Sequence, residues 1–266
     1  MELRNFKALN NLADTSDYVA MLEAFDAIPQ LRELKEIARQ RGGIANGKSV
    51  LDIGCGFGLE TVRLAQLVGP EGHVNGLDKS DAFIAEARRR AEAVSCRVTY
   101  QSGDATNLSF EDASFDCVRA ERLLIYLKDF QSVLAEMRRV LRPGGHLALI
   151  EPDFSTITIN VADRELLRKV IDYEIAHAVE QSWLPGPLNS ALEQLGFQNI
   201  KCDSRALIFQ QDLGATYFKS LGVHAEEAGA ITDTENQEWQ RSIDRLRETG
   251  QIFATVAYFL FTASHP

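Results

Sequence analysis

The chain has 266 residues, of which 45% are hydrophobic and 25% are charged, and it carries a formal net charge of −10. This length and apolar content fit one large α/β domain, with or without a cap, and exclude a disordered or fibrous chain. The acidic balance argues against a sequence-independent grip on nucleic acid, which requires clustered Lys and Arg.

Targeting signals are not evident in the sequence. Residues 1–10 lack the apolar segment and the small-residue cleavage site of a signal peptide. The longest apolar run, Ile252–Thr262, is far shorter than the about 20 residues needed to cross a bilayer. The four cysteines are widely spaced and form no C-x-x-C pair, which indicates a reducing compartment and no structural zinc. We therefore expect a cytoplasmic protein, a monomer or homodimer, with no membrane or nucleic-acid partner.

Residues 1–48 are predicted to be helical, because apolar side chains recur there at helical spacing on both sides of Pro29. These side chains are Tyr18, Met21, Leu22, Phe25, Ile28, Leu31, Leu34 and Ile37. They would pack against the edge of a sheet. A glycine-rich stretch, 42–47, ends this region and leads into the first strand.

The segment Ser49–Gly58, SVLDIGCGFG, predicts a buried strand, a glycine turn and the start of a helix. The apolar run around Leu51 fits a strand covered on both faces. Gly54, Gly56 and Gly58 would allow a tight turn and a close approach of the backbone to a ligand. Residues 59–68 then have helical periodicity, so free N–H groups at the helix start would point at the turn.

The glycine spacing separates two families of nucleotide-binding folds. A dinucleotide fingerprint, G-x-G-x-x-G, would need glycine where this chain has Leu59. The spacing here is G-x-G-x-G, and Asp52 lies two residues before the first glycine. A carboxylate there would repel a pyrophosphate but favour a ligand that carries an ammonium and a sulfonium. The pattern D-x-G-x-G-x-G resembles the first motif of class I S-adenosylmethionine (SAM)-dependent methyltransferases, in the small-molecule type 11 (UbiE-like) group.

Three segments downstream agree with this resemblance. The second strand, His73–Asp78, ends in an acid that can accept both ribose hydroxyls, and Lys79 could pack its stem on the adenine. A helix is expected over 81–93, a third strand over 97–101 and a fourth over 115–120. The resemblance assigns Asp104 and Ala105 to the adenine ring. The sequence L-R-P-G-G before the fifth strand, 146–151, is common in the same family.

The resemblance implies a Rossmann-like α/β fold with a seven-stranded, mostly parallel sheet whose last strand is antiparallel. We expect a single methyltransferase domain over 1–266, with an N-terminal helical lid (1–48), a SAM-binding core (49–151) and cap insertions at 152–186 and 213–250. Helices are expected over 162–181, 188–195, 213–221 and 234–247. Long strands are expected over 197–209 and 251–262.

The expected cofactor is SAM. Its predicted binding residues lie in the lid, in the glycine turn and at the ends of the second, third and fourth strands. They are Tyr18, Asp52, Gly54, Gly56, Gly58, Asp78, Lys79, Asp104, Ala105, Ala120 and Glu121.

Catalytic residues are harder to predict, because methyl transfer from a sulfonium mainly requires placing a nucleophile and excluding water. Candidates near the methyl group are Glu121, Tyr126, Glu151, Asp153, His177 and His224. We favour His177 as a base or orienting residue, with Asp153 and Tyr126 as partners. A divalent metal on Glu121, Glu151 and Asp153 is conceivable, but the Asp-Asn pairing of metal-dependent catechol methyltransferases is missing, and we predict no metal.

The predicted function is methyl transfer to a small-molecule acceptor, either a specialised metabolite or a quinone-like, aromatic compound, in biosynthesis. Apolar and aromatic residues of the predicted cap fit such a pocket. Two alternatives stay open. One is a SAM-binding protein of this fold that catalyses another reaction or acts as a scaffold, and the other is a protein methyltransferase, which the large insertions disfavour.

Overall fold

The computed structural model describes residues 16–92, 98–209 and 211–266, and of residues 16–18 the backbone only. Its sheet has seven strands in the order β3-β2-β1-β4-β5-β7-β6. Strands β1 (Ser49–Ile53), β2 (His73–Asp78), β3 (Val98–Ser102), β4 (Phe115–Glu121) and β5 (Leu141–Ile159) pair in parallel. Strand β7 (Ala254–Ser264) is antiparallel to both β5 and β6 (Gln198–Ile208). The predicted sheet with its antiparallel last strand is confirmed.

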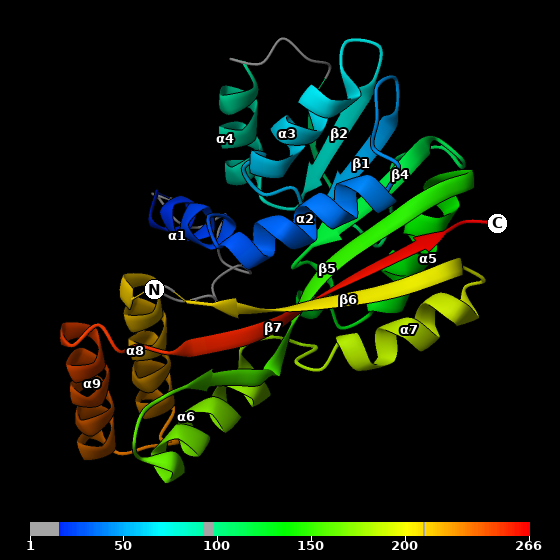
Figure 1. Ribbon diagram of the computed structural model, residues 1–266. Coiled ribbons are helices and arrows are strands. Elements are labelled where there is room, and N and C mark those ends of the chain that lie inside the picture. Colours follow the sequence, from blue (N-terminus) through cyan, green and yellow to red (C-terminus); the bar gives the residue numbers. More distant parts are fainter. Residues whose placement is uncertain (1–15, 93–97, 210) are drawn as a thin grey trace.

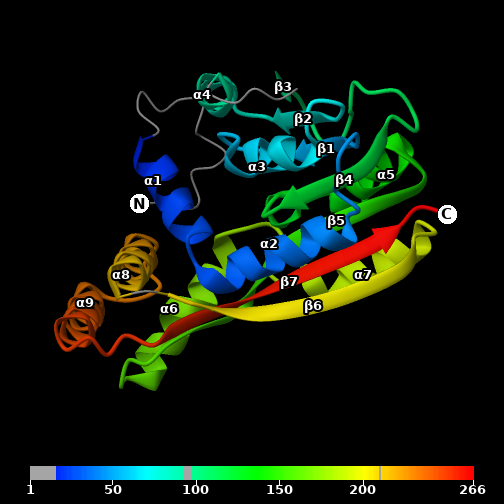
Figure 2. The ribbon, with the colours of Figure 1, turned by 45° about the horizontal axis from the view of Figure 1, so that its top comes forward.

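Helices cover both faces of this sheet (Figures 1 and 2), with α2 (Pro29–Arg41) and α3 (Leu59–Val68) on one face and α5 (Phe130–Val140) and α7 (Pro185–Gln194) on the other. Helix α4 (Asp81–Ala91) packs against β2 and β3. Helix α5 shows why these segments are helical. Its buried residues recur at three- and four-residue spacing, and the Asp129 side chain accepts a hydrogen bond from the Ser132 N–H at its start.

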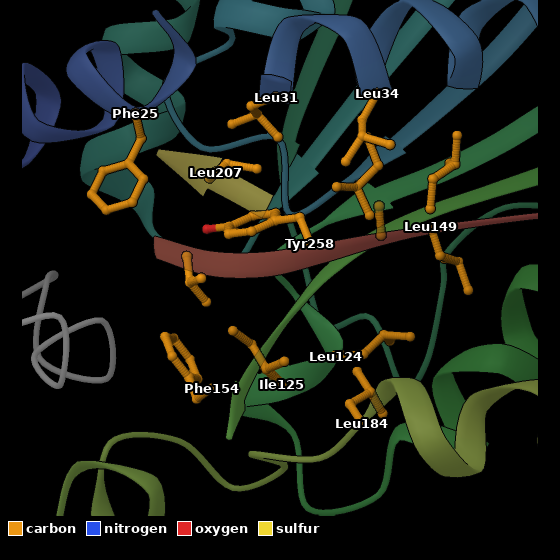
Figure 3. Packing of buried hydrophobic residues seen from close by; sticks show 14 of the residues in the cluster. Phe25, Leu31, Leu34, Leu124, Ile125, Leu149, Phe154, Leu184, Leu207 and Tyr258 are labelled. Atoms are coloured by element: carbon orange, nitrogen blue, oxygen red, sulfur yellow. The ribbon is translucent and has the colours of Figure 1, made fainter. Parts of the chain in front are cut away.

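The core lies on both faces of the sheet. Figure 3 shows Leu31, Leu34 and Leu207 on one side of β7 and Leu124, Leu184 and Phe154 on the other. Leu34 and Leu184 are fully buried, and burying such a side chain contributes about 1.5–3 kcal/mol of transfer free energy. Helix α2, which we expected to pack against the sheet, does so through Leu31 and Leu34.

Strand β5 differs from the prediction, because it is much longer than 146–151. It starts at Leu141, which pairs with Phe115, and it ends at Ile159, which pairs with Ala254. The register shifts between Asp153 and Thr158. The residues after Glu151 that we expected in a cap therefore continue the sheet, since their apolar side chains alternate as in a strand and β7 supplies a partner.

Three helices, α6 (Arg164–His177), α8 (Gln211–Glu227) and α9 (Asp233–Glu248), gather beyond the end of β6 and β7 (Figure 1). Helices α8 and α9 touch at Gly222, where an added Cβ would lie 2.3 Å from Trp239. Trp239 is fully buried and donates to the Phe218 carbonyl at 2.7 Å. Much of the aromatic content of this region thus fills its own core.

Helix α1 (Ser16–Asp26) precedes α2 at the N-terminal side of the described chain (Figure 1). Among the described residues, no helix is both long and apolar enough to cross a bilayer.

Candidate functional site

A cavity of about 600 Å³ lies at the carboxyl ends of β1, β2, β3 and β4. Four exit segments line it, namely 52–57, 77–80, 103–106 and 121–123, together with side chains of α1 and α2. The strand order reverses between β1 and β4, since β1 is followed in the chain by β2 on one side and flanked by β4 on the other. Ligands of open α/β sheets bind at such a switch point.

The glycine turn after β1 has two different roles. Gly54, Gly56 and Gly58 all have positive φ (72°, 54° and 81°), which favours glycine. At Gly56 an added Cβ would meet open space, and this residue lines the cavity together with Gly54. At Gly58 an added Cβ would lie 2.5 Å from the Tyr100 hydroxyl. Gly58, which we expected at the cofactor, does not line the cavity and is required instead by packing against β3.

One end of the cavity, which we call the β2–β3 end, is formed by Asp78, Lys79, Asp104 and Ala105. The carboxylate of Asp78 accepts the N–H groups of Gly56 and Ser80, both at 2.9 Å. Burial raises the pKa of Asp78, and these two N–H groups oppose the rise. Asp104 accepts the Thr106 N–H at 2.9 Å, which lowers its pKa. Each carboxylate keeps lone pairs for hydroxyl or amino donors of a ligand.

The opposite end, which we call the β1–β4 end, contains a group of buried ion pairs. Arg119 of β4 donates to Asp52 at 2.7 Å and to Glu121 at 2.9 Å. Lys35 of α2 lies 3.0 Å from Glu121 and 2.7 Å from Asp26 at the end of α1. The group thus joins two strands to both N-terminal helices, and all five residues line the cavity.

The charges of this group stabilise one another. Burial disfavours the charged form of Arg119, but the carboxylates of Asp52, Glu60 and Glu121 outweigh it and raise its pKa. Burial acts on Glu121 in the opposite sense, yet Lys35 and Arg119 lower its pKa. Such pairs are costly to bury and costly to break, because removing one partner leaves a desolvated charge.

Asp52 lines the cavity as predicted, but its contacts differ from the expected ones. We expected it to face a ligand's ammonium, whereas its two oxygens accept from Arg119 and, at 2.7 Å, from the Thr61 hydroxyl. The Glu121 side chain is more exposed than that of Asp52, at 13% against 2%. Lys35 and Arg119 both contact its Oε2, so its Oε1 can accept from a ligand. One feature of the sequence indicated this arrangement, namely an arginine in the strand F-D-C-V-R-A, which is mostly apolar.

The segment after β4 turns sharply into the cavity. Arg122 has a φ of 49°, which is unusual for a residue with a side chain, and its N–H donates to the Ile150 carbonyl at 2.9 Å. Glu151, which is fully buried, accepts the N–H groups of Leu123 and Leu124 at 3.1 and 2.9 Å. Burial raises the pKa of Glu151 to about 8. Glu151 is therefore a scaffold for this loop and does not line the cavity.

The three predicted catalytic residues are not brought together. Tyr126 lines the cavity. Asp153 lies outside it, in the irregular part of β5, where it accepts from the Ser155 N–H at 2.9 Å. His177 is exposed at the end of α6, and its ring stacks on Tyr173 with centroids 4.5 Å apart. His177, which we predicted as a base or orienting residue, does not line the cavity, and neither does Tyr173 on the same face of α6.

The remaining predicted residues have these positions. Ala120 is fully buried within β4 and does not line the cavity. Tyr18 falls in α1, but its side chain is outside the described part of the structure. His224 is buried in α8, away from the cavity lining. In the described ranges, no three His, Cys, Asp or Glu side chains cluster in a way that could hold a metal ion.

Comparisons with known proteins agree with this arrangement. A family model described as "Methyltransferase domain" matches residues 50–145. An uncharacterized 37.1 kDa protein in transposon TN4556 of Streptomyces fradiae is 32% identical over 93% of this chain and 71% of its own length. Demethylmenaquinone methyltransferase of Listeria welshimeri is 41% identical over 41% of this chain, which spans 46% of that enzyme.

The fold is also that of a solved enzyme. Phosphoethanolamine N-methyltransferase 2 of Haemonchus contortus, in complex with S-adenosyl-L-methionine, superposes with a TM-score of 0.60 at 19% identity. The superposition covers 100% of this chain and 60% of that enzyme.

Proposed function

The chain belongs to the class I SAM-dependent methyltransferases, and on this premise we propose that it transfers the methyl group to a small-molecule acceptor by in-line displacement. A quinone-like or other aromatic compound, or a specialised metabolite, is the proposed acceptor class. A relative of this chain is a demethylmenaquinone methyltransferase, which supports a quinone-like acceptor.

The cavity fits the cofactor. Gly56 leaves open space at the turn, and Asp78 and Asp104 offer carboxylates at the β2–β3 end, where ribose hydroxyls and the adenine amino group would bind. Glu121, beside the glycine turn, would take the ammonium. SAM, when bound, supplies an activated methyl group on a sulfonium. The chain's own residues bind and orient the reactants and exclude water.

The observation that carries the proposal is the wall beyond these polar groups. The cavity is also lined by Leu22 and Phe25 of α1 and by Leu123 and Tyr126 of the segment after β4. An apolar and aromatic wall with a few polar groups is typical of sites for small organic ligands. A cavity of about 600 Å³ also fits a small acceptor better than a protein chain, which would need a long open groove.

The test is release of S-adenosylhomocysteine when the protein is incubated with SAM and a panel of hydroxylated or quinol acceptors. We expect release that depends on both the protein and an acceptor, together with SAM binding tighter than NAD binding in calorimetry. SAM binding without release for any acceptor, protein substrates included, would favour the alternative of a non-methylating reaction or a scaffold.

A further inference from the structure

Lys35 of α2 is a buried lysine that lies between the cofactor site and α1. Its ammonium group is 3.0 Å from Glu121, at the β1–β4 end of the cavity, and 2.7 Å from Asp26, the last residue of α1. The Glu60 carboxylate is farther away, at 3.9 Å. All four residues line the cavity. One ammonium group thus links the residue proposed to bind the cofactor with the residue at which α1 ends.

Asp26 lies at the turn between α1 and α2, since only Ala27 and Ile28 separate the two helices. Its carboxylate accepts from Lys35 at 2.7 Å and from Arg63 of α3 at 2.9 and 2.7 Å. A contact at a turn sets the direction of the helix that ends there. The pairs of Asp26 therefore help to fix the angle between α1 and α2.

Helix α1 supplies part of the apolar wall of the cavity. Leu22 and Phe25 line the cavity, and Leu22 also packs against the buried cluster of Phe57 and Phe83. The angle of α1 determines where Leu22 and Phe25 lie. It therefore determines the shape of the wall that the proposed acceptor would contact.

A ligand ammonium on the Oε1 of Glu121 would change the pairing of Lys35. The Oε2 of Glu121 already contacts Lys35 and Arg119, so the ligand would bring a third cation to one carboxylate. Like charges repel strongly at a buried site. Arg119 is held by Asp52 on the neighbouring strand, whereas Lys35 has a flexible stem and already contacts Asp26. The Lys35 ammonium should therefore shift from Glu121 towards Asp26.

We infer that Lys35 is a positioning residue: the cofactor's ammonium at Glu121 moves Lys35 onto Asp26, which fixes α1 and its part of the apolar wall. This inference rests on the proposed placement of the ammonium at Glu121, and it needs no methyl transfer. It follows that the amino group of the cofactor, in addition to its adenosine part, completes the acceptor site.

Hydrogen exchange of the wild-type protein tests this inference with two ligands. S-adenosylhomocysteine carries the ammonium, and its deamino analogue keeps the adenosine and the carboxylate but lacks the ammonium. Each ligand is used at a concentration that saturates the site in calorimetry. We expect the amides of residues 20–27 to exchange about threefold or more slowly with S-adenosylhomocysteine than with the analogue, because only the ammonium shifts Lys35. The inference is overturned if the two ligands slow this exchange equally.

The Lys35→Met variant should lose the difference between the two ligands. Lys48→Met is the matched control, because Lys48 is an exposed lysine outside the cavity lining, 3.6 Å from Asp116, and its loss changes the net charge equally. The control should keep the difference. If Lys35→Met also keeps it, the ammonium acts on α1 without Lys35 and the inference is overturned. If Lys35→Met does not fold, the comparison of ligands in the wild type still decides.

Failure of the proposed function would appear separately, as no release of S-adenosylhomocysteine with any acceptor. The exchange measurement contains no acceptor, so its result does not depend on that release.

Discussion

The two ends of the main cavity are built in different ways. At the β2–β3 end, backbone N–H groups hold the two acids. Asp78 accepts from Gly56 of the glycine turn and from Ser80, and Asp104 accepts from Thr106. At the β1–β4 end, Asp52, Arg119, Glu121 and Lys35 hold one another, and they come from two strands and a helix. The first end depends on local backbone geometry, and the second depends on the whole fold being assembled.

Because of this difference, substitutions at one end should mainly change the free energy of ligand binding, and substitutions at the other should mainly change the free energy of unfolding. Substituting a group that is held by the backbone should change ligand affinity more than the free energy of unfolding, because few other side chains depend on that group. Groups held by buried opposite charges carry the free energy of unfolding, because each protects the others from being desolvated without a partner. Substitutions at the two ends should therefore be distinguishable by measurement.

The largest effect is expected for Arg119→Met at the β1–β4 end. It leaves Asp52 and Glu121 buried with one cation fewer, so the free energy of unfolding should fall by about 3–5 kcal/mol in chemical denaturation. Arg89→Met removes an exposed arginine paired with Glu86 and should cost no more than about 1 kcal/mol. Equal losses for the two variants would contradict the distinction between the ends.

The next effect concerns the pH dependence of stability through Glu151. Its pKa of about 8 in the folded protein lies above its ordinary value, so folding favours the protonated form. The stabilisation is complete at low pH and is lost as the pH rises towards 8. The wild type should lose about 2–4 kcal/mol between pH 5 and pH 8 relative to Glu151→Gln.

Denaturation midpoints of both proteins across this pH range measure the difference. Glutamine can still accept the two N–H groups of Leu123 and Leu124, so the loop that they form should persist. Parallel pH curves for the two proteins would show that Glu151 is ionised in the folded state.

A smaller effect, on affinity, is expected for Asp78→Ala at the β2–β3 end. Loss of a carboxylate that accepts ligand hydroxyls should weaken SAM binding by about 1–3 kcal/mol in calorimetry. Asp81→Ala removes the same charge nearby, at a residue that does not line the cavity, and should leave SAM affinity nearly unchanged. Equal weakening by both variants would attribute the effect to net charge.

The smallest effect is expected for His177→Ala, because His177 lies outside both ends of the cavity. The side chain is exposed and stacks on Tyr173, so SAM affinity and turnover should both stay within about twofold of the wild type. A large loss of turnover with unchanged SAM affinity would restore His177 to the mechanism and would require α6 to move towards the cavity.

The sequence predicted the locally determined parts of the fold well. The bounds of α3 and β2 were predicted residue for residue, because glycines and hydrophobic periodicity act over a few residues. The positions of Asp78 and Asp104 at strand ends followed from the same signals. Strand β5 was predicted too short, since its last residues become a strand only when β7 pairs with them.

The ion pairs of the β1–β4 end could not be predicted in the same way. Arg119 and Asp52 are 67 residues apart, and their contact depends on the parallel register of β1 and β4. The position of His177 outside the cavity lining has a related cause. Helical periodicity shows which residues share a face, but which face turns towards the cavity is decided by packing against other elements.

The pairing of β5 with β7 on both sides of the register shift between Asp153 and Thr158 limits how ligands can enter and leave. Strand β5 and its partner β7 extend from beside the cavity to α6, α8 and α9, so those helices cannot swing open without breaking the sheet. Helix α1 is attached differently, by the ion pairs of Glu23 with Arg90 and of Asp26 with Lys35 and Arg63, and by the packing of Phe25 on Phe209 and Tyr217. Its residues Leu22 and Phe25 close the cavity. We therefore expect α1 to open and close the cavity. The rate at which these contacts of α1 break should then limit the exchange of product for fresh cofactor.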